Sequence, residues 1–250
     1  MRVAAAAAAL AVGASGISVT TLPRPAFPPS VAGVEASAPV KLTLIASHSH
    51  APTASDHSSA APAGAPLQFD GVELLGAIDN FAVYGRDGLS TRLLLAFDGK
   101  GRFRYGFDFK NYVWPPRIAP GERELVYEEI VWAREVGGVL YVENAHWTYA
   151  RSSYGLNGYI TAIDLKTKKA LWRSRALVAN ARTFVVWRNY LVTGYGFTAE
   201  PDYLYVLDRR TGKTVARLAL PSGPERIVLR GDRVHVRTYD HDVVVELEKT

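Results

Sequence analysis

The side chains best suited to recognition gather in the stretch between Ala145 and Gly158. It carries an imidazole, an indole, two phenols and a guanidinium, on His146, Trp147, Tyr149, Arg151 and Tyr154. Tryptophan, tyrosine and arginine dominate the strongest contacts of binding surfaces, since each joins a large contact area to a hydrogen-bonding group. We predict that these five residues contact a ligand or partner. The alternative is that some of the rings fold over the edge of their own sheet.

Sequence patterns of catalysis and metal binding are missing. The chain has no cysteine, which excludes disulfides, thiolate metal sites and cysteine nucleophiles. It also has no HExxH pair, phosphate-binding glycine loop or Ser/His/Asp order typical of hydrolases. Asp240, His241 and Asp242 offer ligands that suit a divalent cation, although a charged turn is the simpler explanation. The sequence therefore predicts no catalytic residue, no cofactor and no metal site.

A unit of two short apolar strands around a tight turn occurs four times after residue 75. Its turn residues are Asn80, Gly138, Asn189 and Asp232, all of types that tolerate the backbone conformations of hairpin turns. They lie 58, 51 and 43 positions apart, a drifting period in the range of propeller blades. A third strand follows each hairpin. The pattern predicts four repeated β-units.

Several of the third strands are apolar at consecutive positions, as in residues 93–97 and 203–207. Both faces of such strands must be covered. The only stretch with helical spacing is 122–136, and its second half aligns with the strand that ends at Trp187. Sheets must therefore cover sheets. We predict an all-β, β-propeller-like fold of about four blades, mostly of four antiparallel strands, as an incomplete or small propeller.

Residues 162–172 read A-I-D-L-K-T-K-K-A-L-W. This segment resembles the tryptophan-docking motif A-x-D-x-x-T-G-K-x-x-W of PQQ-like (quinoprotein-type) propeller repeats, with Lys168 in place of glycine. The resemblance covers roughly residues 75–249. It implies a propeller architecture in which Trp172 packs between neighbouring blades. A second copy keeps Asp208 and Gly212 but has Ala216 at the tryptophan position.

The sequence also departs from that family. The quinone-dependent dehydrogenases that it resembles have seven or eight blades, a calcium ion beside the quinone and often a vicinal cysteine pair. Only four units are recognisable here, and cysteine is absent. Asp98, Asp164 and Asp208 follow third strands, where they are expected to cap the turn backbone. The resemblance thus implies the fold and no quinone cofactor.

The N-terminal quarter differs in composition from the rest. Arg2 precedes an apolar run up to Val12, and we interpret residues 1–14 as a secretory signal peptide. The run is too short for a transmembrane helix, so a secreted or periplasmic location is predicted. Residues 15–66 are rich in Pro, Ala and Ser and are expected to form a disordered tether. Residues 67–250 remain as the β-propeller-like domain.

One segment of the tether, residues 40–45, alternates like a strand. The last repeated unit lacks a fourth strand, because only two residues follow Glu248. Residues 243–247 would then expose an apolar edge that could template aggregation. We predict that residues 40–45, or failing them a second copy of the chain, pair with this edge.

The formal net charge is +5, with the two signs interspersed, and no basic cluster typical of nucleic-acid binding is present. We predict a non-catalytic binding or scaffold module of the cell envelope, with a protein or polysaccharide partner. It would use the loops between second and third strands, which open on one face: residues 85–91, 145–158, 197–202 and 238–242. The alternative is an enzyme, either a degenerate quinoprotein oxidoreductase or a hydrolase or lyase, with its site on that face.

Overall fold

The computed structural model describes residues 16–25, 39–52, 60–86, 90–112, 117–122, 126, 129–145, 151–197 and 200–250. Their regular structure is β-strand apart from one short 3-10 helix, η1 (Arg151–Ser153). Within these ranges no helix is long and apolar enough to cross a bilayer. The predicted signal peptide, residues 1–14, lies outside the described residues.

Four sheets follow one another along the chain, and we call them blades 1 to 4. Blade 1 contains β3 (Gln68–Phe69), β4 (Val72–Ile78), β5 (Phe81–Arg86), β6 (Ser90–Phe97) and β7 (Phe103–Asp108), with β1 (Val19–Thr21) beside β7. Blade 2 contains β8 (Glu129–Val136), β9 (Val139–Ala145), β10 (Tyr159–Asp164) and β11 (Lys169–Arg173). Blade 3 contains β12 (Val185–Trp187), β13 (Tyr190–Tyr195), β14 (Tyr203–Asp208) and β15 (Thr214–Ala219). Blade 4 contains β16 (Pro224–Arg230), β17 (Arg233–Thr238), β18 (His241–Lys249) and β2 (Val40–Ser49).

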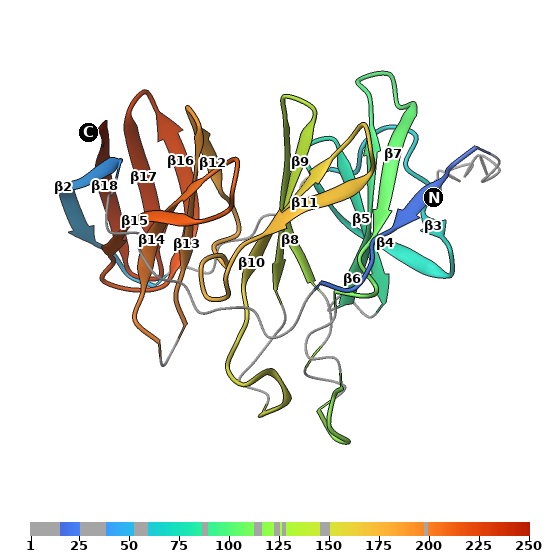
Figure 1. Ribbon diagram of the computed structural model, residues 1–250, viewed down its shortest axis with the longest axis horizontal. Helices are drawn as coiled ribbons and strands as arrows, with labels where there is room; N and C mark the ends of the chain where they lie inside the picture. The colour runs from blue at the N-terminus through green and yellow to red at the C-terminus, as the bar shows by residue number, and fades with distance from the viewer. Residues whose placement is uncertain are drawn as a thin grey trace, which may run out of the picture.

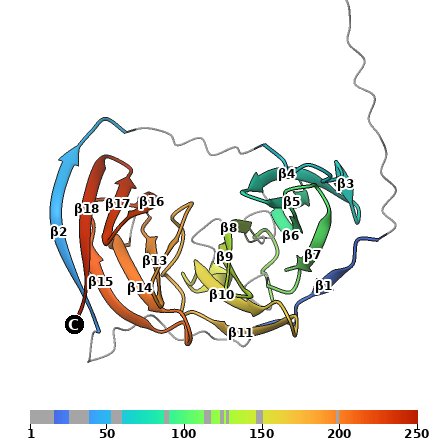
Figure 2. The same cartoon turned by 90° about the horizontal axis from the view of Figure 1, so that it is seen from above.

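The blades stand side by side in an arc (Figures 1 and 2), with blade 1 at one end and blade 4 at the other. Within each blade the consecutive strands are antiparallel neighbours. The predicted all-β, β-propeller-like fold is therefore confirmed. Residues 129–136, the second half of the one stretch with helical spacing, form strand β8.

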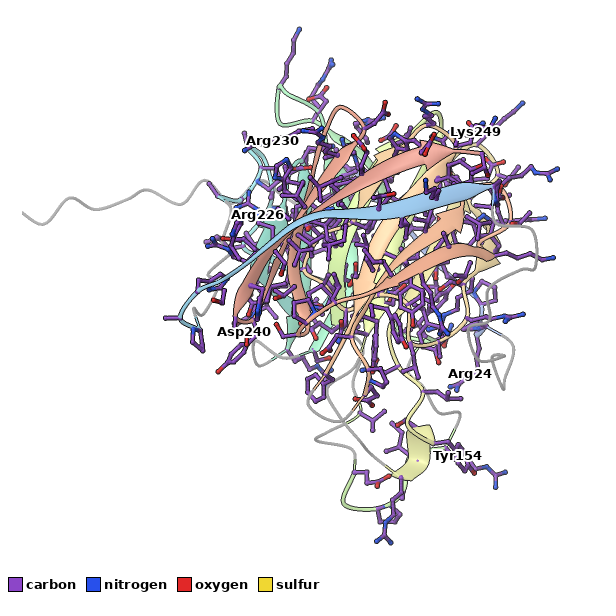
Figure 3. The ribbon with its side chains drawn as sticks, turned by 90° about the vertical axis from the view of Figure 1, so that its left-hand side faces the viewer. Arg24, Tyr154, Arg226, Arg230, Asp240 and Lys249 are labelled. Carbon is purple, nitrogen blue, oxygen red and sulfur yellow. The ribbon has the colours of Figure 1, made fainter. Side chains whose placement is uncertain are left out.

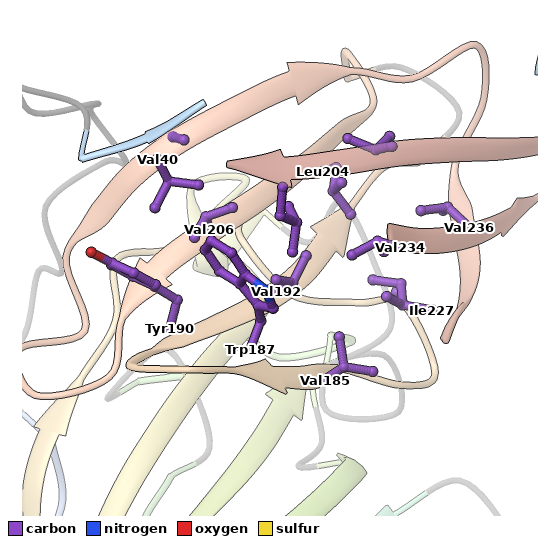
Figure 4. Packing of buried hydrophobic residues seen from close by; sticks show 14 of the residues in the cluster. Val40, Val185, Trp187, Tyr190, Val192, Leu204, Val206, Ile227, Val234 and Val236 are labelled. Atoms are coloured by element: carbon purple, nitrogen blue, oxygen red, sulfur yellow. The ribbon is translucent and has the colours of Figure 1, made fainter. Parts of the chain in front are cut away.

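Three of the four buried hydrophobic clusters in the described ranges lie between consecutive blades, because the central strands are apolar on both faces, and the fourth lies on the outer face of blade 1. Leu191 on β13 belongs to a buried cluster shared with blade 2, whereas its neighbour Val192 faces blade 4. The cluster between blades 3 and 4 includes Trp187, Leu204 and Val234 (Figure 4). Among the described residues, no hydrophobic cluster joins blade 1 to blade 4. Each blade is thus covered by its sequence neighbours, as expected for sheets that cover sheets.

Polar contacts tie each blade to the next. Between blades 1 and 2, the Tyr105 hydroxyl donates to Glu135 Oε2 at 2.6 Å. Between blades 2 and 3, Trp172 Nε1 donates to the carbonyl oxygen of Arg209 at 3.1 Å. The expected packing of Trp172 between neighbouring blades is confirmed.

The turn aspartates act on the backbone, as predicted. Asp164 Oδ1 accepts from the backbone N–H groups of Lys166 and Thr167 at 2.7 and 3.1 Å. Asp98 and Asp208 cap their own turns in the same way. These hydrogen bonds hold the pKa of Asp98 and of Asp164 below the ordinary aspartate value. Hydrogen bonds to a charged carboxylate favour that form, so these aspartates stabilise turns.

The N-terminal part of the chain supplies a strand to each end of the arc. The predicted pairing of residues 40–45 with 243–247 is present: β2 runs antiparallel to β18 from Val40 opposite Lys249 to Ser49 opposite His241. Strand β1 pairs in parallel with β7, a contact that the sequence does not predict. Both strands lie in the segment 15–66 that the sequence assigns to a tether. Val19 of β1 and the nearby Ile17 pack on the outer face of blade 1.

Blade 4 ends the arc with a polar outer face. Directly opposite residues of an antiparallel pair share a face, and Arg226 lies opposite Arg237 and Arg230 opposite Arg233. Arg237 pairs with Asp242 at 2.8 Å and Arg233 with Glu246 at 3.4 Å. Figure 3 looks onto this end of the molecule and labels Arg226 and Arg230.

Candidate functional site

Described residues of the connections between second and third strands of blades 2, 3 and 4 line one cleft. They lie on the lower side of the molecule in Figure 1. The cleft has a volume of about 540 Å³. It is lined by Glu129, Val131, Ala145, Gly155, Asn157, Asn180, Arg182, Tyr195, Gly196, Phe197, Glu200, Asp202, Ser222, Gly223, Pro224, Glu225 and Tyr239. The predicted loop face therefore carries a concave site shared by three blades.

The connections between blades line the cleft as well. Asn180 and Arg182 come from the segment that joins blade 2 to blade 3, and residues 222–225 come from the segment that joins blade 3 to blade 4. The Asn180 side chain fixes the end of β13: its Nδ2 donates to Gly196 O at 2.8 Å, and its Oδ1 accepts from Gly196 N at 3.1 Å. The floor is thus built on hydrogen-bonded backbone.

Gly196 allows a carboxylate to lie against this backbone. A Cβ atom at Gly196 would overlap Asp202 Oδ1 and lie 2.8 Å from the Cα atom of Gly223. Glycine is needed because any side chain would displace Asp202. The Asp202 Oδ1 atom is buried and has no hydrogen-bond partner among the described residues. Burial, and then the charges of Glu200 and Asp240, raise the pKa of Asp202.

The pKa of Asp202 is raised, whereas the pKa of the nearby Asp240 is lowered. Asp240 Oδ1 accepts from Ser222 Oγ and lies 2.7 Å from His241 Nδ1. These contacts hold the pKa of Asp240 below its ordinary value. Asp202 therefore takes up a proton more readily than Asp240 does.

Carboxylates and aromatic rings supply seven of the seventeen described residues that line the cleft. Among the described residues that line the cleft, four are acidic and one, Arg182, is basic: the acidic ones are Glu129, Glu200, Asp202 and Glu225. Two rings stand at the solvent side, Phe197 with 45% of its surface exposed and Tyr239 with 55%. The cleft is therefore negative in a chain whose formal net charge is +5.

A carboxyl group that the sequence analysis missed lies beneath the cleft. Glu143 on β9 is fully buried, and neither of its oxygens has a hydrogen-bond partner among the described residues. Burial, and then the charge of Glu129, raise the pKa of Glu143 well above the ordinary value. The one available signal was an acidic residue that directly follows the apolar strand run 139–142.

The five residues predicted from the sequence are only partly placed. His146, Trp147 and Tyr149 lie outside the described residues. Arg151 and Tyr154 belong to a segment that projects from the body of the molecule, with Tyr154 75% exposed (Figure 3). The backbone N–H of Arg151 donates to Glu122 Oε1 at 2.9 Å. Neither Arg151 nor Tyr154 lines the cleft, although Gly155 does.

The charged turn at 240–242 points its side chains in different directions. Asp242 pairs with Arg237 through both carboxylate oxygens, at 2.9 and 2.8 Å, whereas Asp240 contacts Ser222 and His241. In the part of the chain that the structure describes, no three His, Asp or Glu residues are grouped to hold a metal ion.

No protein-family model matches the chain, and no curated protein matches it significantly. Solved structures with a similar arrangement include the computationally designed Ika8 protein, with 13% identity over 67% of this chain and 42% of that chain and a TM-score of 0.43. BamB from Moraxella catarrhalis has 12% identity over 79% of this chain and 61% of that chain, with a TM-score of 0.37. The quinohemoprotein alcohol dehydrogenase ADHIIG from Pseudomonas putida HK5 has 10% identity over 68% and 38%, with a TM-score of 0.38. At these levels none of their activities is transferred to this chain, which spans less than two thirds of each of the three.

Proposed function

We propose that the chain is a non-catalytic binding module that holds its ligand or partner in the cleft of blades 2, 3 and 4. The observation that carries this proposal is the convergence of six chain segments from three blades on one concave site. Concave sites with aromatic walls and a few polar groups are the usual places for ligands. Phe197 and Tyr239 supply exposed rings at the solvent side, and Asn180 holds the floor.

We also propose a repeat family, a cellular location and a class of partner for the chain. The motif at residues 162–172 supports placing the chain among PQQ-like propeller repeats, and the docking of Trp172 on Arg209 agrees with that family's packing. The signal-peptide pattern supports export to the periplasm or beyond. There, a protein or a polysaccharide is the partner. Intact-mass measurement on protein secreted by a suitable host tests export: cleavage near Ala14 is expected, and full-length chain retained in the cytosol would contradict it.

A thermal-shift screen of peptides, oligosaccharides and small metabolites tests the site. We expect a ligand that raises the Tm of the wild-type protein and of Tyr154→Ala, but leaves the Phe197→Ala/Tyr239→Ala variant unshifted. Tyr154 serves as the control because it is exposed on the projecting segment, away from the cleft lining. Loss of the shift in Tyr154→Ala alone would move the site to that segment, and equal shifts in all three proteins would contradict a role for the cleft.

A further inference from the structure

We propose that the cleft receives an organic cation, and that its primary ammonium group pairs with Glu143 between blades 2 and 3. This inference rests on the proposed function, since it names the ligand chemistry of the same cleft. It starts from the excess of carboxylates over Arg182 in the lining and from a buried acid below the floor.

Strand geometry places Glu143 directly under the cleft. Residues two apart on a strand point to the same face, about 7 Å from each other. Ala145 lines the cleft, and Glu129, opposite it on β8, lines the cleft too. Glu143 therefore lies one step deeper on the same face of β9. Tyr141, one step deeper again, belongs to the core shared with blade 3, so this face looks towards blade 3.

The facing strand repeats the arrangement. Tyr195 on β13 lines the cleft, and both Tyr195 and Leu191 belong to the core shared with blade 2. Thr193, between them on the same face, is fully buried, and its Oγ1 atom has no hydrogen-bond partner among the described residues. Two buried polar side chains without partners thus lie beneath the floor, one on each facing sheet.

Buried polar groups in proteins are nearly always hydrogen-bonded, so two exceptions that each lie one step below a lining residue, on facing sheets, require an explanation. A hydrogen-bond donor that descends from the cleft would satisfy both the Glu143 carboxylate and the Thr193 hydroxyl oxygen. A primary ammonium suits this position because it is a compact charge with three donors on a flexible stem. The apolar stem would pass Tyr195, and the rings of Phe197 and Tyr239 would face any second cationic group at the mouth.

Proton release follows from this pairing. Without a cation nearby, burial raises the pKa of the Glu143 carboxyl well above its ordinary value and so favours the protonated form. When the ammonium binds, the O–H proton leaves Glu143 for the buffer, and the carboxylate pairs with the cation. The charged and titratable groups around it are Glu129 on β8, Tyr195 on β13, and Arg182, Glu200, Asp202 and Glu225 in the lining above. Binding should tighten as pH rises.

Calorimetric titration of the full chain with 1,5-diaminopentane tests the inference, with pentane-1,5-diol as the uncharged control. Titration at pH 7 in phosphate and in Tris measures proton release, because the two buffers differ in ionisation enthalpy. We expect the diamine alone to bind, and its binding to release protons to the buffer. Tighter binding of the tripeptide Gly-Lys-Gly would assign the ammonium to a protein partner, and tighter binding of the diamine to a free amine.

Two isosteric variants separate the floor from the mouth. Glu143→Gln should weaken diamine binding about tenfold or more and abolish proton release, because its amide cannot ionise. Glu225→Gln, in the lining, should keep the proton release. Equal binding of the diol, or unchanged proton release in Glu143→Gln, would overturn the inference while leaving a cleft ligand of another class in place. If the thermal-shift screen finds no cleft ligand of any kind, the proposed function itself fails.

Discussion

The indole nitrogen of Trp172 donates a hydrogen bond to the carbonyl oxygen of Arg209, and this 3.1 Å contact links blade 2 to blade 3. The same ring packs 5.9 Å from the ring of Tyr141 and lies against Gly212 in the turn of blade 3. Trp172 on β11 therefore contacts Tyr141 in the core between blades 2 and 3, and also the turn of blade 3 that carries Arg209 and Gly212. One side chain thus adds both a hydrogen bond and ring packing to the contact between blades 2 and 3.

Replacing Trp172 by alanine should lower the free energy of unfolding by about 3 kcal/mol, because a largely buried indole is lost and a cavity remains. Leu171→Ala is the matched control, since Leu171 is the adjacent residue of β11 and is 55% exposed. Chemical denaturation of both variants measures the difference. Equal losses would contradict the docking of blade 2 on blade 3 through Trp172.

The contact between the Trp172 ring and the turn of blade 3 can also be tested at Gly212. Its φ of +71° disfavours a side chain, and an added Cβ would overlap the Trp172 ring. Gly231 has a similar φ of +63° in a hairpin turn with open space around it. Gly231→Ala should cost about 1 kcal/mol for the backbone alone. Gly212→Ala should cost at least about 2 kcal/mol, because the ring must also move. Equal shifts in Tm would show that the ring yields freely.

Two aspartate–arginine pairs differ in burial and should differ in energy. Asp108 in blade 1 has 4% of its side chain exposed and contacts Arg92 at 2.6 Å. Asp242 has 50% exposed and contacts Arg237 at 2.8 Å. Asp108→Ala should cost about 3 kcal/mol, since Arg92 loses a buried partner. Asp242→Ala should cost at most about 1 kcal/mol. Urea unfolding of the two variants gives the comparison, and similar midpoints would contradict it.

Glu143 and Glu135 should respond to pH with opposite signs. The hydrogen bonds from Arg104 and Tyr105 lower the pKa of Glu135, so its stabilisation is present above pH 4.5 and is lost as pH falls. The pKa of Glu143 is raised, so the cost of ionising this carboxyl in the folded protein is absent below pH 4.5 and grows as pH rises. At pH 7 we expect Glu135→Gln to lower Tm and Glu143→Gln to raise it. At pH 3.5 both differences in Tm should shrink. A change in Tm for Glu143→Gln that is the same at both pH values would contradict a buried, ionisable carboxyl group at this position.

Removal of the N-terminal strands should expose both ends of the arc. A chain that begins at residue 60 lacks β1 and β2, so β18 loses its antiparallel neighbour. We expect a lower Tm and self-association through the free β18 edge. A chain that begins at residue 16 keeps both strands and is the control. Size-exclusion chromatography and thermal unfolding measure the outcome, and an unchanged, monomeric shortened chain would contradict the prediction.

The repeated pattern predicted the blades because each hairpin combines two apolar strands with a turn residue of a type that tolerates the backbone conformation of a hairpin turn. The pairing of β2 with β18 was also predictable, since the last unit lacked a strand and Val40–Ser49 begins with alternating residues. Strand β1 was not, because three residues carry too little pattern. Short parallel pairings of this kind depend on the finished surface of blade 1, which sequence alone does not show.

The loop face was predicted and the cleft lies on it, but the residues that line the cleft are not among the five that the sequence singled out as binding residues. The turn spacing placed the loop face, and Glu200 and Asp202 fall in loops that the sequence had assigned to it. Tyr195 and Glu143 are parts of strands, and strands were interpreted as core. The connections that carry Asn180 and Arg182 join consecutive blades, and their approach to the loop face follows from the arc rather than from local spacing.

Strand β2 and its partner β18 lie about 200 residues apart in sequence. At a synthesis rate of roughly 5–20 residues per second, β2 is made about 10–40 seconds before β18 exists. Blades 2 and 3 can form from contiguous chain during this time, but blade 4 cannot. Premature termination and N-terminal proteolysis therefore produce the same damage, a last sheet with an open edge, and blade 4 is complete only in chains that are intact at both ends.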